Sequence, residues 1–286
     1  MNNGKEVIIM SVNILDIKNL SFHYKSLDLE SKDYWVNIFK NVSMEIKEGS
    51  IIGVAGKSGC GKTTLGKAIV NYHDLFGSYI ANKDYKINGK ISYNHNGASI
   101  DVISDEYKKI NPPPIQMVFQ DPRTSLNMKM NLFDQLKESI KLKFNLSKDD
   151  LREKIYQIAK DFKIQNQLSS IPLNLSGGQR RRFGLAKIVS SNPKIIIADE
   201  PVASLDVSIK RDIMNVLFGL KKKNMTIVVI SHDIALLQEK ADFIFVFDKG
   251  EIVEKWNPSK DPKHEATKNL INDSNYVNEF VKNVKI

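Results

Sequence analysis

The sequence predicts an α/β fold built around a parallel sheet. Short apolar segments at 51–55, 195–198, 227–230 and 243–247 have the length and composition of buried strands. Helix-like stretches separate the last three of these segments. Buried strands that alternate with helices are typical of a parallel α/β core. Apolar residues at helical spacing in 131–170 predict an additional helical part.

The N-terminal third predicts a smaller β part. Residues 14–17 resemble a short strand, and residues 42–46 alternate apolar and polar side chains, as a half-buried strand does. Residues 81–101 read as short strands, and the Asn-Gly pairs Asn88-Gly89 and Asn96-Gly97 predict hairpin turns between them.

The segments outside these elements carry weaker patterns. The charged stretch 25–33 is interpreted as a loop, and the polar tail from Trp256 as a loosely attached extension. Ser147, followed three residues later by Asp150, predicts a helix start.

Composition limits the class of protein. The chain has 286 residues, 42% of them hydrophobic, and no apolar run near the roughly 18 residues that cross a bilayer. Val7–Met10 is too short for a signal peptide, so a cytoplasmic protein is expected, with translation starting at Met1 or Met10. The single cysteine, Cys60, excludes a disulfide framework and a cysteine metal cluster. The net charge of +9 comes from scattered lysines and indicates a solvated surface rather than a nucleic-acid partner.

Residues 56–63 fit the pattern G-x-x-x-x-G-K-[ST], directly after an apolar strand and before a helix. Glycines let backbone N–H groups turn inward around phosphates, and the helix N-terminus adds positive potential. Lys62 is expected to reach the β- and γ-phosphates of ATP and Thr63 to bind Mg²⁺. Cys60 is interpreted as a small loop residue. The predicted nucleotide-binding residues here are Gly56, Ser58, Gly59, Cys60, Gly61, Lys62, Thr63 and Thr64.

Two carboxylates end the apolar strand at 195–198. Asp199 is expected to hold Mg²⁺ through water, as a P-loop enzyme requires. Glu200 can polarise the attacking water as a general base.

Leu175-Ser176-Gly177-Gly178-Gln179 is the signature pentapeptide of ATP-binding cassette (ABC) ATPases, which the chain resembles. Ser176 with the backbone of Gly177 and Gly178, followed by Gln179, looks like a second phosphate-binding helix start. Arg180, Arg181 and Arg182 come next, and Arg181 at least is interpreted as a helix-surface residue.

The resemblance implies roles for further residues in the family's order. Gln120 matches the glutamine that reaches Mg²⁺ and the attacking water, in a loop that senses a transmembrane partner. Residues 203–206, ending at Asp206, match the D-loop. His232 matches the switch histidine that contacts the γ-phosphate, and Tyr24 matches the aromatic residue that stacks on adenine.

The resemblance also implies an organisation. Residues 13–255 would form the ABC ATPase domain, a P-loop NTPase fold with an antiparallel β subdomain and a helical subdomain at about 128–190. Residues 256–286 would be a C-terminal extension. Because the family places ATP between the P-loop of one cassette and the signature of another, a head-to-tail dimer with a second ABC ATPase subunit is implied.

Three segments resemble the oligopeptide, dipeptide and nickel importers: 121–127, 205–209 and 261–268, the last departing at Glu265 and Ala266. One branch of that group carries a cysteine cluster that this chain lacks, so a paralogous partner ATPase is the preferred interpretation. Two permease subunits, and indirectly an extracellular substrate-binding protein, would complete an importer at the cytoplasmic face of the membrane. Peptide, nickel and metal-chelate import stay open. An exporter, a lipid-extracting ATPase, a nucleic-acid or ribosome ATPase and a purely regulatory cassette are the alternatives.

Overall fold

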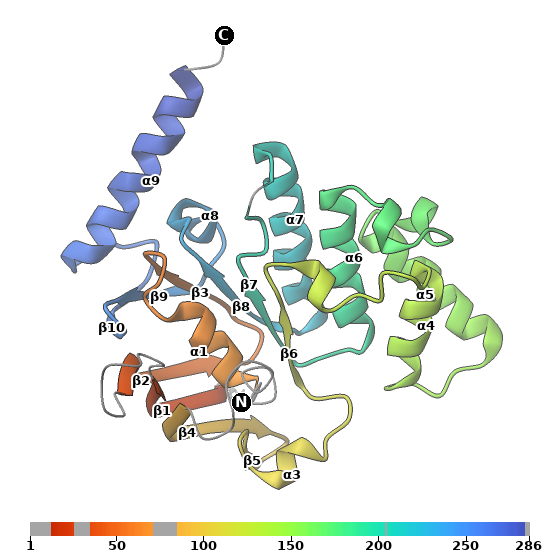
Figure 1. Ribbon diagram of the computed structural model, residues 1–286, viewed down its shortest axis with the longest axis horizontal. Helices are drawn as coiled ribbons and strands as arrows, with labels where there is room; N and C mark the ends of the chain where they lie inside the picture. Colours follow the sequence, from red (N-terminus) through yellow and green to blue (C-terminus); the bar gives the residue numbers. More distant parts are fainter. Residues whose placement is uncertain (1–12, 26–34, 71–84, 204, 284–286) are drawn as a thin grey trace, which may run out of the picture.

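The computed structural model describes residues 13–25, 35–70, 85–203 and 205–283 (Figure 1). Two sheets lie side by side, and a group of helices gathers at one end of the larger sheet. The predicted loop at 25–33, except Lys25, lies outside the described residues, as do Met1 and Met10.

The larger sheet has the strand order β10-β9-β3-β8-β7-β6. Its strands from β9 to β6 pair in parallel, whereas β10 pairs antiparallel with β9. The parallel sheet predicted from the apolar segments is therefore confirmed. The strands are β3 (Ile51–Gly56), β6 (Ile115–Val118), β7 (Ile195–Asp199), β8 (Thr226–Ser231), β9 (Phe243–Asp248) and β10 (Glu251–Trp256).

The smaller sheet is antiparallel, with the order β2-β1-β4-β5. Its strands are longer than the sequence predicted, because β1 and β2 run far beyond their apolar centres. They are β1 (Asn13–Lys25), β2 (Trp35–Lys47), β4 (Tyr85–His95) and β5 (Ala98–Asp101).

One of the two predicted hairpin turns is wrong. Asn96-Gly97 joins β4 to β5 as expected, but Asn88-Gly89 lies inside β4. Gly89 has a φ of 102°, and the pairing with β1 shifts register beside it, between Lys18 and Ser21. A Cβ at Gly89 would lie 2.5 Å from the Asn19 carbonyl oxygen. The glycine thus serves a close approach of two strands rather than a turn.

Helices cover the larger sheet and form the predicted helical part. Ser147 is the N-cap of α5, and its hydroxyl accepts from the Asp150 amide at 3.2 Å, as predicted. No helix in the described ranges is long and apolar enough to cross a membrane. The helices are α1 (Lys62–Ile69), α3 (Asp105–Lys108), α4 (Leu132–Lys141), α5 (Lys148–Asp161), α6 (Gly177–Ser190), α7 (Val207–Gly219), α8 (Ile234–Gln238) and α9 (Glu265–Asn283).

The expectation of a loosely attached tail is wrong for its first part. The Trp256 ring is buried and donates to the Lys260 carbonyl at 2.7 Å. Thr267 and Leu270, on α9, are also buried. The Glu254 carboxylate accepts from the amides of Lys263 and His264 and from the Thr267 hydroxyl. Polar composition hid this attachment, because isolated apolar residues and hydrogen bonds, rather than a continuous apolar run, hold the segment.

Candidate nucleotide site

The 56–63 loop lies at the carboxyl end of β3 and opens α1, the place where parallel α/β sheets bind ligands. Gly61 is the N-cap of α1 with a φ of 103°, and Gly59 has a φ of 80°. These left-handed conformations explain why glycine occupies both positions. A pocket of about 380 Å³ borders the loop. It is lined by Ile38, Ser58, Gly59, Gly61, Lys62, Thr63, Thr64, Gln120, Glu200 and His232.

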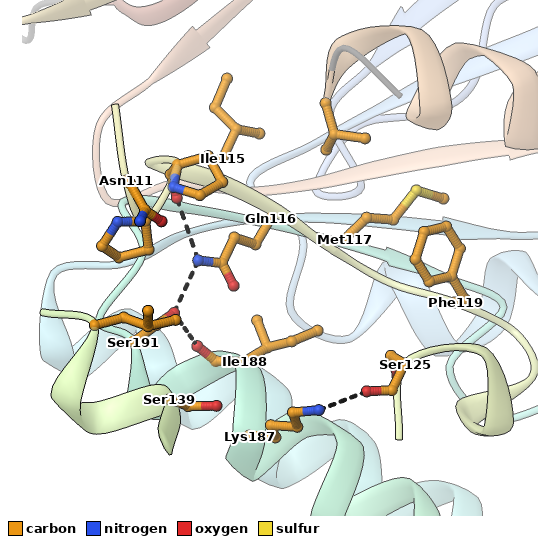
Figure 2. Close-up of a pocket in the computed structure, with 14 residues that line it drawn as sticks. Asn111, Ile115, Gln116, Met117, Phe119, Ser125, Ser139, Lys187, Ile188 and Ser191 are labelled. Atoms are coloured by element: carbon orange, nitrogen blue, oxygen red, sulfur yellow. Dashed lines mark hydrogen bonds between the residues drawn. The ribbon is translucent and has the colours of Figure 1, made fainter. Parts of the chain in front are cut away.

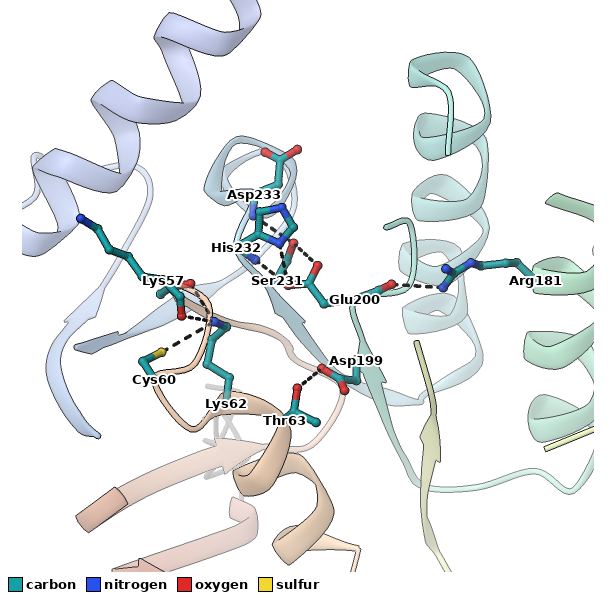
Figure 3. A network of polar contacts seen from close by, with 11 residues as sticks. Lys57, Cys60, Lys62, Thr63, Arg181, Asp199, Glu200, Ser231, His232 and Asp233 are labelled. Atoms are coloured by element: carbon teal, nitrogen blue, oxygen red, sulfur yellow. Dashed lines mark hydrogen bonds and ion pairs between the residues drawn. The ribbon is translucent and has the colours of Figure 1, made fainter. Parts of the chain in front are cut away.

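Lys62 is almost completely buried, with 5% of its surface exposed. Its ammonium donates to the carbonyls of Gly56 at 2.7 Å and Lys57 at 2.8 Å. Its Nζ also lies 3.6 Å from Cys60 Sγ (Figure 3). The P-loop backbone therefore fixes a positive charge at the floor of the pocket.

Thr63 and Asp199 are far apart in the sequence but form a hydrogen bond in the structure. The Thr63 hydroxyl donates to Asp199 Oδ1 at 3.0 Å, joining the start of α1 to the end of β7 (Figure 3). Burial raises the pKa of Asp199, the Thr63 hydrogen bond lowers it, and the nearby Glu200 raises it further. A buried carboxylate beside a hydroxyl is an environment that a hard cation would stabilise.

Glu200 and His232 are in direct contact above the P-loop. Glu200 Oε1 accepts from the His232 amide at 3.0 Å and lies 2.8 Å from His232 Nδ1. The Ser231 hydroxyl donates to Glu200 Oε2 at 3.4 Å. Figure 3 shows both side chains on the loops that follow β7 and β8. The Glu200 amide donates to the Ile230 carbonyl at 2.9 Å, so the carboxylate and the imidazole are set by neighbouring strands.

The signature segment stands apart from this pocket. Ser176 caps α6, and a reciprocal capping box links its hydroxyl and amide to Gln179. Ser176 and Gly177 are exposed to solvent, whereas Gly178 is buried against Ile209. Of the described residues, those from Ser176 to Gln179 do not line the P-loop pocket.

Of three further predicted residues, one lines the pocket and two do not. Gln120 follows β6 and lines the pocket. Tyr24 lies near the end of β1, half-buried, and packs against an apolar cluster that both sheets share; it is not among the residues that line the pocket. Asp206 is the N-cap position of α7 without a capping hydrogen bond. Ser204, in the predicted D-loop, lies outside the described residues.

Sequence reasoning missed Ile38, which lines the pocket from β2. A Cβ on Gly61 would lie 3.0 Å from the Ile38 carbonyl oxygen, and a Cβ on Gly250 would lie 2.7 Å from it. The Lys40 amide also donates to the Gly250 carbonyl at 2.9 Å. Ile38 thus packs between the P-loop and the β9–β10 turn. No local motif marks it, because its role depends on how the two sheets meet.

The interpretation of Arg181 as a helix-surface residue is wrong. Its guanidinium is half-buried and donates to the carbonyls of Glu200 at 3.1 Å and Ala203 at 3.0 Å. Burial lowers the pKa of Arg181, while the charges of Asp121 and Glu200 act in the opposite direction. Helical position alone could not reveal this contact, since α6 turns this side chain toward the end of β7.

Gln135 was also missed. This buried side chain on α4 accepts from the Asn127 amide at 3.0 Å and donates to the carbonyls of Asn127 and Met130. Lys187, on α6, donates to the Ser125 carbonyl at 2.7 Å. Together they fix the chain after Gln120 on the helical part. A buried glutamine among the apolar residues of an amphipathic helix is the signal that could have indicated it.

Comparisons with known proteins show the family of the chain. The family model described as ABC transporter matches residues 39–203. The oligopeptide transport ATP-binding protein OppF of Streptococcus pyogenes serotype M1 is 32% identical over 92% of this chain and 82% of its own length. The dipeptide transport ATP-binding protein DppF of Lactococcus lactis subsp. cremoris is 31% identical over 90% of this chain and 80% of its own.

Solved structures share the fold. The cbiO1 protein of Clostridium perfringens, part of the transporter complex cbiONQ, superposes with a TM-score of 0.68 at 25% identity, covering 87% of this chain and 90% of its own. A dimeric ATP-binding cassette in a post-hydrolysis state with ADP and Pi gives a TM-score of 0.69 at 24% identity, covering 85% and 98%. With the P-loop, the paired carboxylates and the signature each at a strand or helix end, the chain belongs to the ABC transporter family as one of its ATPase subunits.

Proposed function

We propose that the chain powers a membrane importer of oligopeptides or dipeptides by hydrolysing ATP. The observation that carries the ATPase role is one pocket in which Lys62, Glu200 and His232 converge. The import of peptides is supported by the relatives, several of which are named as oligopeptide or dipeptide transport ATP-binding proteins. Nickel or metal-chelate import is not favoured by these names.

Mg²⁺ fits the oxygen-bearing side chains at and next to the base of the pocket. Thr63 and Gln120 line the pocket, and the Thr63 hydroxyl lies 3.0 Å from the carboxylate of Asp199. Oxygen ligands of this kind are those that Mg²⁺ prefers. We infer that these three residues hold the ion, directly or through water. The ion would neutralise charge on the phosphates of ATP.

Glu200, His232 and Lys62 have different roles in ATP hydrolysis. Glu200 is the general base that takes a proton from the attacking water, because it lines the same pocket as the loop that would hold phosphate. His232 contacts that carboxylate, and we infer that its imidazole orients Glu200 and the terminal phosphate. Lys62 supplies positive charge to the phosphates from a site that excludes water.

The position of the signature implies a partner. Because Ser176 to Gln179 form an exposed helix start that does not line the P-loop pocket of the described chain, we infer that they bind the nucleotide of another subunit. The site would then be completed in a head-to-tail dimer, with a paralogous ATPase as the preferred second subunit. Asp206, beside the signature at the start of α7, would lie in the same interface.

A groove next to Gln120 supports a membrane partner (Figure 2). It has a volume of about 320 Å³, and its wall is mostly apolar. Figure 2 shows Met117 and Phe119 on one side of it, and Lys187 and Ile188 of α6 on the other. We infer that a permease segment docks here, holding the ATPase at the cytoplasmic face of the membrane. An extracellular binding protein would act only indirectly.

Purification of the native complex from membranes tests the function. The chain is expected to co-purify with two permease subunits and a second ATPase, and the complex in proteoliposomes to show ATPase activity stimulated by a peptide-loaded binding protein. Stimulation by a nickel- or chelate-loaded binding protein, with none by peptides, contradicts the peptide assignment. Co-purification of rRNA or DNA in place of permeases contradicts transport altogether.

A further inference from the structure

The side chain of Arg181 connects two functional segments within one chain. It projects from α6, five residues after the Ser176 cap, and its two terminal nitrogens bind the carbonyls of Glu200 and Ala203. Figure 3 shows it reaching from α6 to the loop that follows Asp199. A rise of about 1.5 Å per residue puts Arg181 within roughly 8 Å of the exposed helix start along the helix axis.

The segment that Arg181 binds is a constrained turn. Glu200 has a φ of 44°, a left-handed conformation that a glutamate rarely adopts. The Ala203 amide donates to the Glu200 carbonyl at 3.2 Å and closes the turn, while the Glu200 amide donates to the Ile230 carbonyl. Arg181 binds the carbonyls at both ends of this turn. An unusual backbone conformation persists where its surroundings over-determine it, and Arg181 is one of those surroundings.

The geometry of the guanidinium suits this task. Its planar fork presents several donors in fixed directions, so two carbonyls bound at once define both their separation and their orientation. The carboxylate of Glu200 extends from the same backbone that the fork holds. Arg181 is not among the residues that line the pocket containing Lys62, so its effect on hydrolysis is indirect, and its contact with the Glu200 carbonyl is the direct link to a residue that does line it.

The neighbouring arginines make different contacts. Arg180 donates to the carbonyls of Pro172 and Leu175, which precede the helix. Arg182 pairs with Asp212 on α7 at 2.8 Å. Of this run, Arg181 is the residue seen to bind the Glu200 turn. The electrostatic influence of Arg181 also reaches Asp121, directly after Gln120.

We propose that Arg181 is a positioning residue that ties the signature helix to Glu200 and to the start of the D-loop, and so couples two ATP sites. The proposal rests on the head-to-tail dimer of the proposed function. In that dimer Ser176 contacts the nucleotide of one site while Glu200 acts on the nucleotide of the other. A rigid helix that moves when its start engages nucleotide then carries the displacement to the Glu200 turn.

The test compares Arg181→Ala and Arg181→Gln with the matched control Arg182→Ala, measured as purified, assembled ATPase with no cargo. The Arg181 variants are expected to lower kcat about 10- to 100-fold, the range caused by small misplacement of a reacting group. Nucleotide affinity should stay within about twofold, because Lys62 is untouched. The Hill coefficient for ATP should fall from above 1 towards 1. Arg182→Ala is expected to lower Tm while kcat and the Hill coefficient stay at the parent values.

Hydrogen exchange provides a readout that does not require the dimer. The amides of 200–203 should exchange faster in Arg181→Gln than in the parent, and Arg181→Lys should restore protection only in part, since an ammonium lacks the fork. If Arg181→Ala has the same kcat per folded molecule as the parent protein, the positioning role is overturned. Lower kcat with an unchanged Hill coefficient overturns the coupling of two sites. Failure of peptide import leaves both readouts intact, so the two proposals are separable.

Discussion

Glu200 Oε1 and His232 Nδ1 lie 2.8 Å apart, although the two residues follow different strands of the parallel sheet. The contact brings a carboxylate that can accept a proton against an imidazole that can donate or accept one. The Glu200 carboxylate is therefore oriented by two groups of His232, its imidazole and its backbone amide.

Glu200→Gln is expected to abolish turnover while nucleotide still binds. An amide has the shape of the carboxylate but cannot take a proton from water, and loss of a general base costs about 100- to 10,000-fold in rate. Steady-state ATPase assays measure the rate, and size-exclusion chromatography with ATP should reveal a trapped dimer. Hydrolysis at the parent rate by the assembled variant would show that Glu200 is not the base.

Lys62→Ala is expected to weaken nucleotide binding. The ammonium is buried and held by the Gly56 and Lys57 carbonyls, so its position is set before nucleotide arrives. Loss of hydrogen bonds from a charged donor costs about 1.5–3 kcal/mol, or roughly 10- to 150-fold in Kd. Titration with a fluorescent ATP analogue measures the affinity. Lys160→Ala, an exposed lysine on α5, is the control and should bind like the parent.

Two glycines of the P-loop should respond differently to alanine. A Cβ at Gly56 would overlap the Phe247 carbonyl of the paired strand β9, which ladder hydrogen bonds hold in place. Overpacking of this kind costs about 3 kcal/mol. Gly59 has open space around it, so Gly59→Ala meets only the strain of its φ of 80°, about 1–2 kcal/mol. Chemical denaturation should rank Gly56→Ala as the less stable variant; equal losses would contradict the steric explanation.

Glu254→Ala should release the start of α9. The carboxylate accepts three hydrogen bonds from 263–267, and losing such bonds costs about 2 kcal/mol. Limited trypsin digestion should then cleave faster at Lys260 and Lys263. Glu251→Ala, on the same strand but exposed and ion-paired with Lys40, is the control and should digest like the parent.

The same residue gives a pH dependence. Partial burial would raise the pKa of Glu254, but hydrogen bonds from Thr267, Lys263 and His264 outweigh it and hold the pKa below its usual range. A carboxyl with a lowered folded-state pKa stabilises above its unfolded pKa of about 4.3 and loses this as pH falls through the folded value. The stability difference between parent and Glu254→Ala should therefore be constant from pH 7 to about 5 and shrink below that.

The sequence predicted the elements whose cause is local. Apolar strands at 195–198 and 227–230, the P-loop between β3 and α1, and the Ser147 cap depend on neighbours within a few residues. The Asn88-Gly89 turn was wrong because Gly89 serves contact with a strand about 70 residues earlier in the chain. The attachment of α9 was missed because it depends on the Glu254 carboxylate and on isolated apolar residues such as Leu270 rather than on a continuous apolar run.

The sequence predicted which motif residues form the candidate site, but not the residues that hold them in place. Motif residues such as Lys62, Glu200 and His232 converge as expected. Arg181 and Ile38 did not stand out, because their contacts join segments 19 to 212 residues apart in numbering, such as Arg181 with Glu200 and Ile38 with Gly250. Contacts of that kind depend on how helix and sheets pack, which periodicity and spacing do not encode.

The position of the Ile38 carbonyl has a further consequence for how the sequence of this chain can evolve. One oxygen atom faces both Gly61 in the nucleotide loop and Gly250 in the turn between β9 and β10. A side chain gained at either glycine would press on the same atom, so the effects of the two substitutions would not be independent. The nucleotide loop at Gly61 and the β9–β10 turn at Gly250 are therefore constrained together during evolution. A substitution that is tolerated at one position limits which substitutions are tolerated at the other.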